Sequence, residues 1–105
     1  MRYGLSETVI ERLTSVFASN PKIEVAILFG SRAKGTYKEG SDIDIALKGD
    51  LLDLPALRKI ELEIDVLFLP YAVDMILFHK INEPLLTEHI NLIGICIYKK
   101  QTKSA

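Results

Sequence analysis

The residues best suited to chemistry begin where a glycine and a serine follow an apolar run. Gly30 and Ser31 come directly after Ile23–Phe29, which is mostly apolar and rich in β-branched residues. A glycine lets the backbone approach a ligand closely, and the free N–H groups of a helix start favour a phosphate. The Ser31 hydroxyl can add a donor, while Arg32 and Lys34 supply positive charge. The pattern indicates a phosphate-binding turn.

A pair of aspartates, Asp42 and Asp44, begins eleven residues after Ser31. Residues two apart on a strand point to the same face, so both carboxylates project together while Ile43 and Ile45 face the core. Adjacent carboxylates repel each other unless a cation lies between them, and hard oxygen ligands suit Mg²⁺. Each pattern alone is common in ordinary turns and on solvated strands. Together they provide what nucleotidyl transfer requires.

The combined pattern resembles the signature of the minimal nucleotidyltransferases of the DNA polymerase β superfamily. Gly30-Ser31, ten intervening residues and Asp42-Ile43-Asp44 carry the resemblance, with no departure at the motif positions. Further segments also resemble this family, namely Arg32–Gly35, Ser41, Leu69–Asp74, Asn82–Leu86 and Glu88–Ile90. The resemblance therefore covers nearly the whole chain and implies a polymerase-β-like nucleotidyltransferase fold.

The third carboxylate of that family has two candidates here, Asp65 and Asp74. Asp65 falls within a helical pattern and is expected on the solvent side of that helix. Asp74 falls within a strand pattern, so its carboxylate can lie beside those of Asp42 and Asp44 on neighbouring strands. We therefore predict that Asp74 is the third carboxylate.

The resemblance implies a Mg²⁺-dependent enzyme that uses ATP as its substrate. It assigns catalysis and the binding of two Mg²⁺ ions to the three carboxylates, Asp42, Asp44 and Asp74. It assigns nucleotide binding to the turn, Gly30, Ser31 and Arg32. An acceptor hydroxyl attacks the α-phosphorus in line, Asp74 accepts its proton, and pyrophosphate leaves.

The resemblance also implies a protein partner. Minimal members are similar to the antitoxin half of a toxin–antitoxin pair, whose toxin is a small helical HEPN-type protein with ribonuclease activity. It implies that AMP is added to a tyrosine of this toxin and silences it. One alternative is an antitoxin that acts by binding alone, which a mean hydropathy of +0.21 favours. The other is transfer to an RNA end or a small molecule, and near-neutral charge weighs against RNA.

Composition is consistent with a small globular protein. The chain has 105 residues, 49% apolar and 26% charged, with a formal net charge of −1. We expect residues 1–105 to form a single domain. The one cysteine, Cys96, excludes an intramolecular disulfide and a cysteine-rich zinc site. The N-terminus lacks a signal-peptide pattern and no apolar run has membrane-spanning length, so we expect a cytoplasmic protein.

Alternating helices and strands must position these residues. Apolar spacing predicts helices over Glu7–Ala18, with Ser6 as N-cap, over Asp53–Leu67, and from Asn82–Pro84 to Gly94. Strands are predicted over Ile23–Phe29, Asp42–Leu47, Ala72–Phe78 and Ile95–Tyr98. A short helix after Gly30 completes an alternating order. The predicted class is α/β (α+β), with a small mixed sheet of about four strands flanked by helices.

Four other residues receive no catalytic role. His79 and His89 lie ten residues apart, without the spacing of metal ligands. Cys96 falls in an apolar strand pattern and is expected to be a buried thiol. Tyr37, between the two motifs, either stacks on a base or anchors its loop.

Overall fold

The computed structural model describes residues 2–101. Its elements are α1 (Glu7–Ala18), β1 (Val25–Phe29), α2 (Gly30–Lys34), β2 (Ile43–Lys48), α3 (Leu54–Asp65), β3 (Val73–Leu77), the 3-10 helix η1 (Phe78–Lys80), α4 (Pro84–Ile93) and β4 (Ile95–Lys99). The predicted helices and strands are all present, and Ser6 caps α1 as expected. The sequence did not predict η1. Within residues 2–101, the helices are too short or too polar to cross a membrane.

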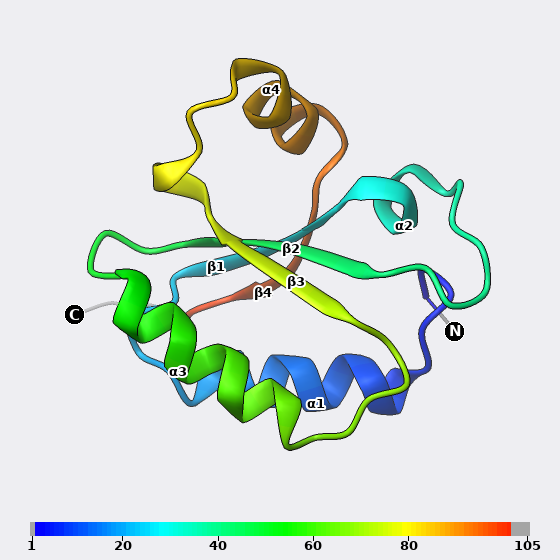
Figure 1. The fold of residues 1–105 in the computed structure, drawn as a ribbon, viewed down its shortest axis with the longest axis horizontal. Coiled ribbons are helices and arrows are strands. Elements are labelled where there is room, and N and C mark those ends of the chain that lie inside the picture. Colours follow the sequence, from blue (N-terminus) through cyan, green and yellow to red (C-terminus); the bar gives the residue numbers. More distant parts are fainter. Residues whose placement is uncertain (1, 102–105) are drawn as a thin grey trace.

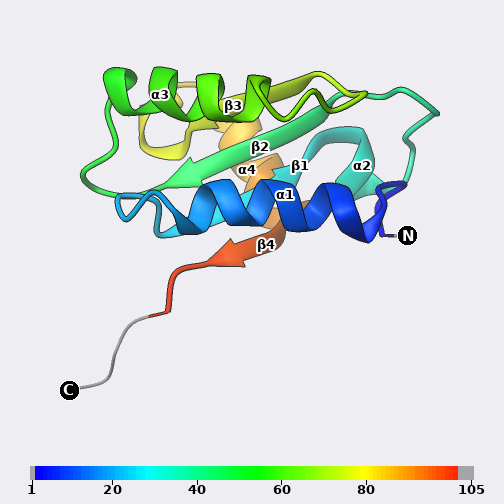
Figure 2. The ribbon, with the colours of Figure 1, turned by 90° about the horizontal axis from the view of Figure 1, so that it is seen from below.

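The strands form one mixed sheet in the order β3-β2-β1-β4. β1 is antiparallel to both β2 and β4. β2 and β3 are parallel because α3 returns the chain along the sheet between them. Figure 1 shows α1 and α3 on one face of the sheet and α4 on the other, and Figure 2 shows α1 and α3 together from below. The expected fold class is confirmed.

The main core lies between the sheet and the layer formed by α1 and α3. Phe17 from α1, Ile60 from α3, and Leu28 and Ile45 from the sheet are almost completely buried. Burying a side chain of this size stabilises the fold by about 1.5–3 kcal/mol. Because side chains alternate along a strand, Asp44 projects to the opposite face, toward the α4 side.

α4 packs on that opposite face over a smaller apolar layer. Ile90 of α4 and Ala46 of β2 are fully buried, yet both lie outside the main core cluster. A side chain at Gly94 would collide with Ile27 of β1 and with the Ile90 carbonyl group. This close approach fixes the end of α4 against β1.

Cys96 is exposed, so the prediction of a buried thiol is wrong. Its neighbours Ile95 and Ile97 pack against the main core, and alternation turns Cys96 to the other face of β4. β4 is an edge strand, where that face is open. An apolar run on an edge strand does not bury both of its faces.

Candidate active site

Three carboxylates lie at the beginning of β2 and β3, on the face away from α1 and α3. Asp44 and Asp74 are register partners in the parallel β2–β3 pair, so their side chains project side by side. Asp42 is exposed and directly precedes β2. Asp65 is the last residue of α3, in the layer on the opposite face. The structure therefore places Asp74, and not Asp65, beside the predicted pair.

Negative charge converges on Asp44. Burial raises the pKa of the Asp44 carboxyl, and the carboxylates of Asp74 and Asp42 raise it further. His89 acts on this pKa in the opposite direction. Packing in the sheet holds these like charges together, which is unfavourable for the ionised form. The cluster consequently favours the arrival of a cation.

The donor set fits Mg²⁺ as it is bound in nucleotide enzymes. Within residues 2–101, no three His, Cys, Asp or Glu side chains form a ready-made metal cage. Mg²⁺ does not require such a cage, because it is usually held by one or two carboxylates together with substrate phosphates and waters. The like-charged carboxylates around Asp44 provide these hard oxygen ligands.

The glycine turn lies against Asp44. Gly30 begins α2 with a φ of +73°, a conformation that side chains rarely adopt. A Cβ at this position would collide with Oδ2 of Asp44. Phe29, the preceding residue, is the register partner of Asp44 on β2. Only a glycine lets the turn and the carboxylate come this close.

The Arg32 side chain is held by other parts of the chain. It is buried, with 3% of the residue exposed. Nε and Nη2 both donate to the Ser41 carbonyl oxygen, at 3.1 and 2.7 Å, and Nη1 donates to the Tyr3 carbonyl oxygen at 2.9 Å. The guanidinium carbon lies 4.8 Å from the ring centroid of Tyr71. These contacts occupy the group, so the expected role of Arg32 in nucleotide binding does not fit this placement.

Arg32 instead anchors the loop that leads to the aspartates. Ser41, whose carbonyl oxygen it binds, is the residue before Asp42. Tyr37 of the same loop lies over the guanidinium, with its ring centroid 5.3 Å from the central carbon. Tyr37 therefore makes the contact expected of a loop anchor, and its alternative role, stacking on a base, stays a prediction. Together these contacts hold the loop from α2 to β2.

His89 reaches the site although its sequence position did not suggest it. Its Nε2 accepts a hydrogen bond from the backbone N–H of Gly30, at 3.2 Å. One signal was present in the sequence, because Leu86, His89, Ile90 and Ile93 recur at the spacing of the inward face of a helix. That spacing places His89 near the sheet but does not say which strand it meets.

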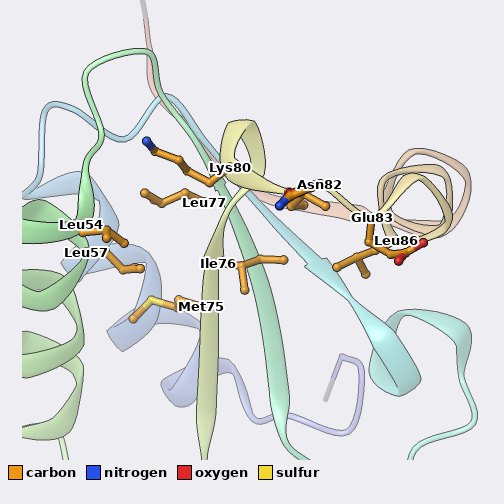
Figure 3. A pocket seen from close by; sticks show the side chains of 10 residues that line it. Leu54, Leu57, Met75, Ile76, Leu77, Lys80, Asn82, Glu83 and Leu86 are labelled. Atoms are coloured by element: carbon orange, nitrogen blue, oxygen red, sulfur yellow. The ribbon is translucent and has the colours of Figure 1, made fainter.

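A mostly apolar hollow of about 610 Å³ lies along the free edge of β3 (Figure 3). Leu54 and Leu57 of α3 line one side, and Leu86 of α4 lines the other. Met75, the residue after Asp74, lies between them. The hollow lacks the phosphate-binding turn, so it suits apolar side chains of another molecule better than a triphosphate.

A glycine turn beside paired carboxylates suits nucleotidyl transfer. Comparison with known families agrees with this interpretation. The chain belongs to the family described as Polymerase beta, Nucleotidyltransferase, which it matches over residues 11–103. The expected fold family and the class of enzyme, a nucleotidyltransferase, are thereby confirmed. A search among curated proteins found no match to this chain.

Similar solved structures come from toxin–antitoxin complexes. A chain of a toxin–antitoxin complex with AMP-PNP is 26% identical, with a TM-score of 0.70 over 88% of this chain and 74% of that one. A chain of a mutant MntA–HpeT toxin–antitoxin complex is 28% identical, with a TM-score of 0.66 over 92% and 75%. A chain from the complex of a tri-AMPylated Shewanella oneidensis HEPN toxin with an MNT antitoxin shares the fold at 20% identity, with a TM-score of 0.68 over 91% and 74%. The resemblance to minimal nucleotidyltransferases, abbreviated MNT, is confirmed.

Proposed function

We propose that this chain is an antitoxin that transfers AMP from ATP to a tyrosine of a cognate HEPN-type toxin and silences it. The observation that carries the proposal is the pairing of Asp44 with Asp74 beside the Gly30 turn. The similar complexes with AMP-PNP and with MntA–HpeT support the nucleotide and the kind of partner. The tri-AMPylated HEPN toxin in the Shewanella complex supports AMP as the transferred group.

The three carboxylates and the turn divide the chemistry between them. Asp42, Asp44 and Asp74 would hold two Mg²⁺ ions, which supply positive charge for the phosphates and the leaving pyrophosphate. Gly30 lets the turn lie against Asp44, and the Ser31 hydroxyl donates a hydrogen bond to the triphosphate. The acceptor oxygen bonds to the α-phosphorus as the bond from that phosphorus to pyrophosphate breaks. Asp74 accepts the proton of the attacking hydroxyl.

The position of Asp74 favours a macromolecular acceptor. Asp74 is exposed on β3, an edge strand, so an acceptor can approach it from outside the sheet. The hollow beside Met75 continues along the same edge and is lined largely by apolar side chains. A protein that covers this hollow would bring its own hydroxyl group close to Asp74.

The test is AMP transfer from labelled ATP to a candidate HEPN-type partner protein, with Mg²⁺ present. We expect the acceptor to gain the mass of AMP on a tyrosine, and the Asp42→Asn, Asp44→Asn double variant to lose the transfer. Asp65→Asn is the matched control because it removes a carboxylate from the opposite layer. Label transfer that persists in the double variant would sink the proposal.

Neutralisation by binding alone is the second candidate, and exposed side chains on α4 favour it. Leu85 and Leu92 are 73% and 74% exposed. Two leucines this exposed on one helix suit a contact with another protein. The double aspartate variant separates the two functions in cells that express the toxin. Survival with the variant would favour binding alone, whereas loss of protection with retained complex formation would favour transfer.

A further inference from the structure

His89 joins α4 to the turn that carries Gly30, across 59 residues of sequence. Its Nε2 accepts the Gly30 N–H, and its ring packs edge-on against Phe29 with centroids 6.2 Å apart. The side chain is half-buried, so the hydrogen bond is partly shielded from water. His89 thus contacts two consecutive residues at the junction of β1 and α2.

Both ends of α4 are fixed, and this holds His89 in place. Glu83 caps the start of the helix by accepting a hydrogen bond from the Leu85 N–H. At the other end, Gly94 packs closely on Ile27 of β1. α4 also contacts α2, the short helix that follows the turn. A residue on a helix fixed in this way positions its partner more firmly than a loop residue would.

The hydrogen bond sets a requirement on both partners. An acceptor nitrogen needs a free lone pair, so this bond requires a His89 ring with Nε2 unprotonated and its N–H on Nδ1. The Gly30 N–H is already committed and is not available to a phosphate while this bond is present. The phosphate contacts expected of the turn therefore fall to groups after Gly30, beginning with Ser31.

The position of the Gly30 turn also affects the Asp44 carboxylate. Gly30 lies against Oδ2 of Asp44. A rotation of the turn would therefore move Gly30 into this carboxylate or away from it. We propose that His89 is a positioning residue of the active site: by holding the Gly30 N–H, it fixes the turn against Asp44 for productive nucleotide binding. This inference rests on the proposed nucleotidyl transfer.

Two variants separate the hydrogen bond from the packing. His89→Phe keeps an aromatic ring beside Phe29 but has no acceptor, whereas His89→Gln keeps an acceptor without the ring. Glu88→Gln is the matched control because its side chain is exposed on the same helix. We expect His89→Phe to lower kcat/KM for ATP roughly 10- to 100-fold, since small displacements of reacting groups have effects of this size. His89→Gln should recover most of that loss, and Glu88→Gln should match the wild type.

A direct measurement keeps this inference separate from the proposed reaction. Proton–nitrogen NMR of the labelled chain reports the Nδ1–H form of His89 and the bonded Gly30 amide, with and without Mg²⁺ and AMP-PNP. We expect both signals to persist when AMP-PNP binds, whether or not any acceptor is modified. If AMP-PNP breaks the hydrogen bond, or if His89→Phe retains wild-type kcat and KM, the positioning role is wrong. If the wild-type chain binds AMP-PNP but transfers no AMP, the proposed function fails while this spectrum still tests His89.

Discussion

Asp44 lies directly opposite Asp74 across the parallel β2–β3 pair, with both carboxylates on the same face of the sheet. Nearby strand positions on the other face carry Ile45 and Met75, which are buried in the core. The strong alternation in these strands therefore holds two like charges together. The fold accepts this repulsion, and the Mg²⁺ of the proposed reaction would relieve it.

The first prediction concerns the stability of the protein as pH changes. The raised pKa of Asp44 means that the folded state binds this proton more tightly than the unfolded chain does. Stability therefore falls as the pH rises from the ordinary pKa of 3.8 through the raised value, and the penalty is complete above it. Asp44→Asn removes that charge, so we expect a higher Tm than wild type at pH 7 in Mg²⁺-free buffer.

Thermal unfolding followed by circular dichroism between pH 3 and pH 8 measures this effect. The advantage of Asp44→Asn should disappear below pH 3.8, where the wild-type carboxyl is protonated in both states. Asp50→Asn serves as the control because Asp50 is exposed after the other end of β2. A variant that is less stable than wild type at pH 7 would contradict the electrostatic interpretation.

The second prediction compares two glycines that share a backbone conformation. Gly30 and Gly40 have φ values of +73° and +83°, so an alanine at either position carries a strain of roughly 1–2 kcal/mol. A Cβ at Gly40 meets no atom within 4 Å, whereas a Cβ at Gly30 collides with the Asp44 carboxylate. We expect Gly30→Ala to reduce AMP transfer by about 100-fold or more.

Gly40→Ala should retain most of the activity while losing a similar amount of stability to strain. Rates of AMP transfer and free energies of unfolding, measured for both variants, separate strain from displacement of the carboxylate. Equal losses of activity in the two variants would mean that the contact between Gly30 and Asp44 has no part in catalysis.

Much of the fold could be predicted because its signals are local. Helical spacing and a serine N-cap predicted α1 with the observed ends. The alternation of Asp42, Ile43 and Asp44 predicted which face carries the carboxylates. The choice of Asp74 over Asp65 also followed from local patterns, because one lies in a strand and the other in a helix.

The remaining features depend on contacts between distant parts of the chain. Arg32 looked like a phosphate ligand because its charge follows the glycine turn, yet carbonyl oxygens of Tyr3 and Ser41 surround it in the fold. His89 meets Gly30 only because α4 returns over β1. Spacing along a single sequence does not identify such partners. It indicates which face of an element a residue occupies, and no more.

The third prediction concerns metal and nucleotide binding without turnover. Mg²⁺ with AMP-PNP should stabilise the wild-type chain, by roughly 2.7 kcal/mol at a ligand concentration of 100 times Kd. The Asp42→Asn, Asp44→Asn variant lacks two of the proposed ligands, so the same addition should leave its Tm unchanged. Excess EDTA should reverse the wild-type shift. A shift of equal size in the double variant would show that the nucleotide binds elsewhere.

The last prediction concerns whether Arg32 anchors the loop before Asp42 or binds phosphate. Three hydrogen bonds from its guanidinium reach the carbonyl oxygens of Ser41 and Tyr3, and a lysine ammonium lacks the planar fork that makes them. Arg32→Lys leaves some of these buried carbonyl oxygens without a hydrogen bond, so we expect a loss of about 1–3 kcal/mol in the free energy of unfolding.

Lys34→Ala, an exposed change in the same helix, is the control and should alter stability by less than about 0.5 kcal/mol. At a temperature where both variants are folded, a loop anchor predicts weaker binding of Mg²⁺ with AMP-PNP together with the loss of stability, because the loop that leads to Asp42, a proposed metal ligand, is no longer held. A stable Arg32→Lys variant with a raised KM would instead make Arg32 a phosphate ligand.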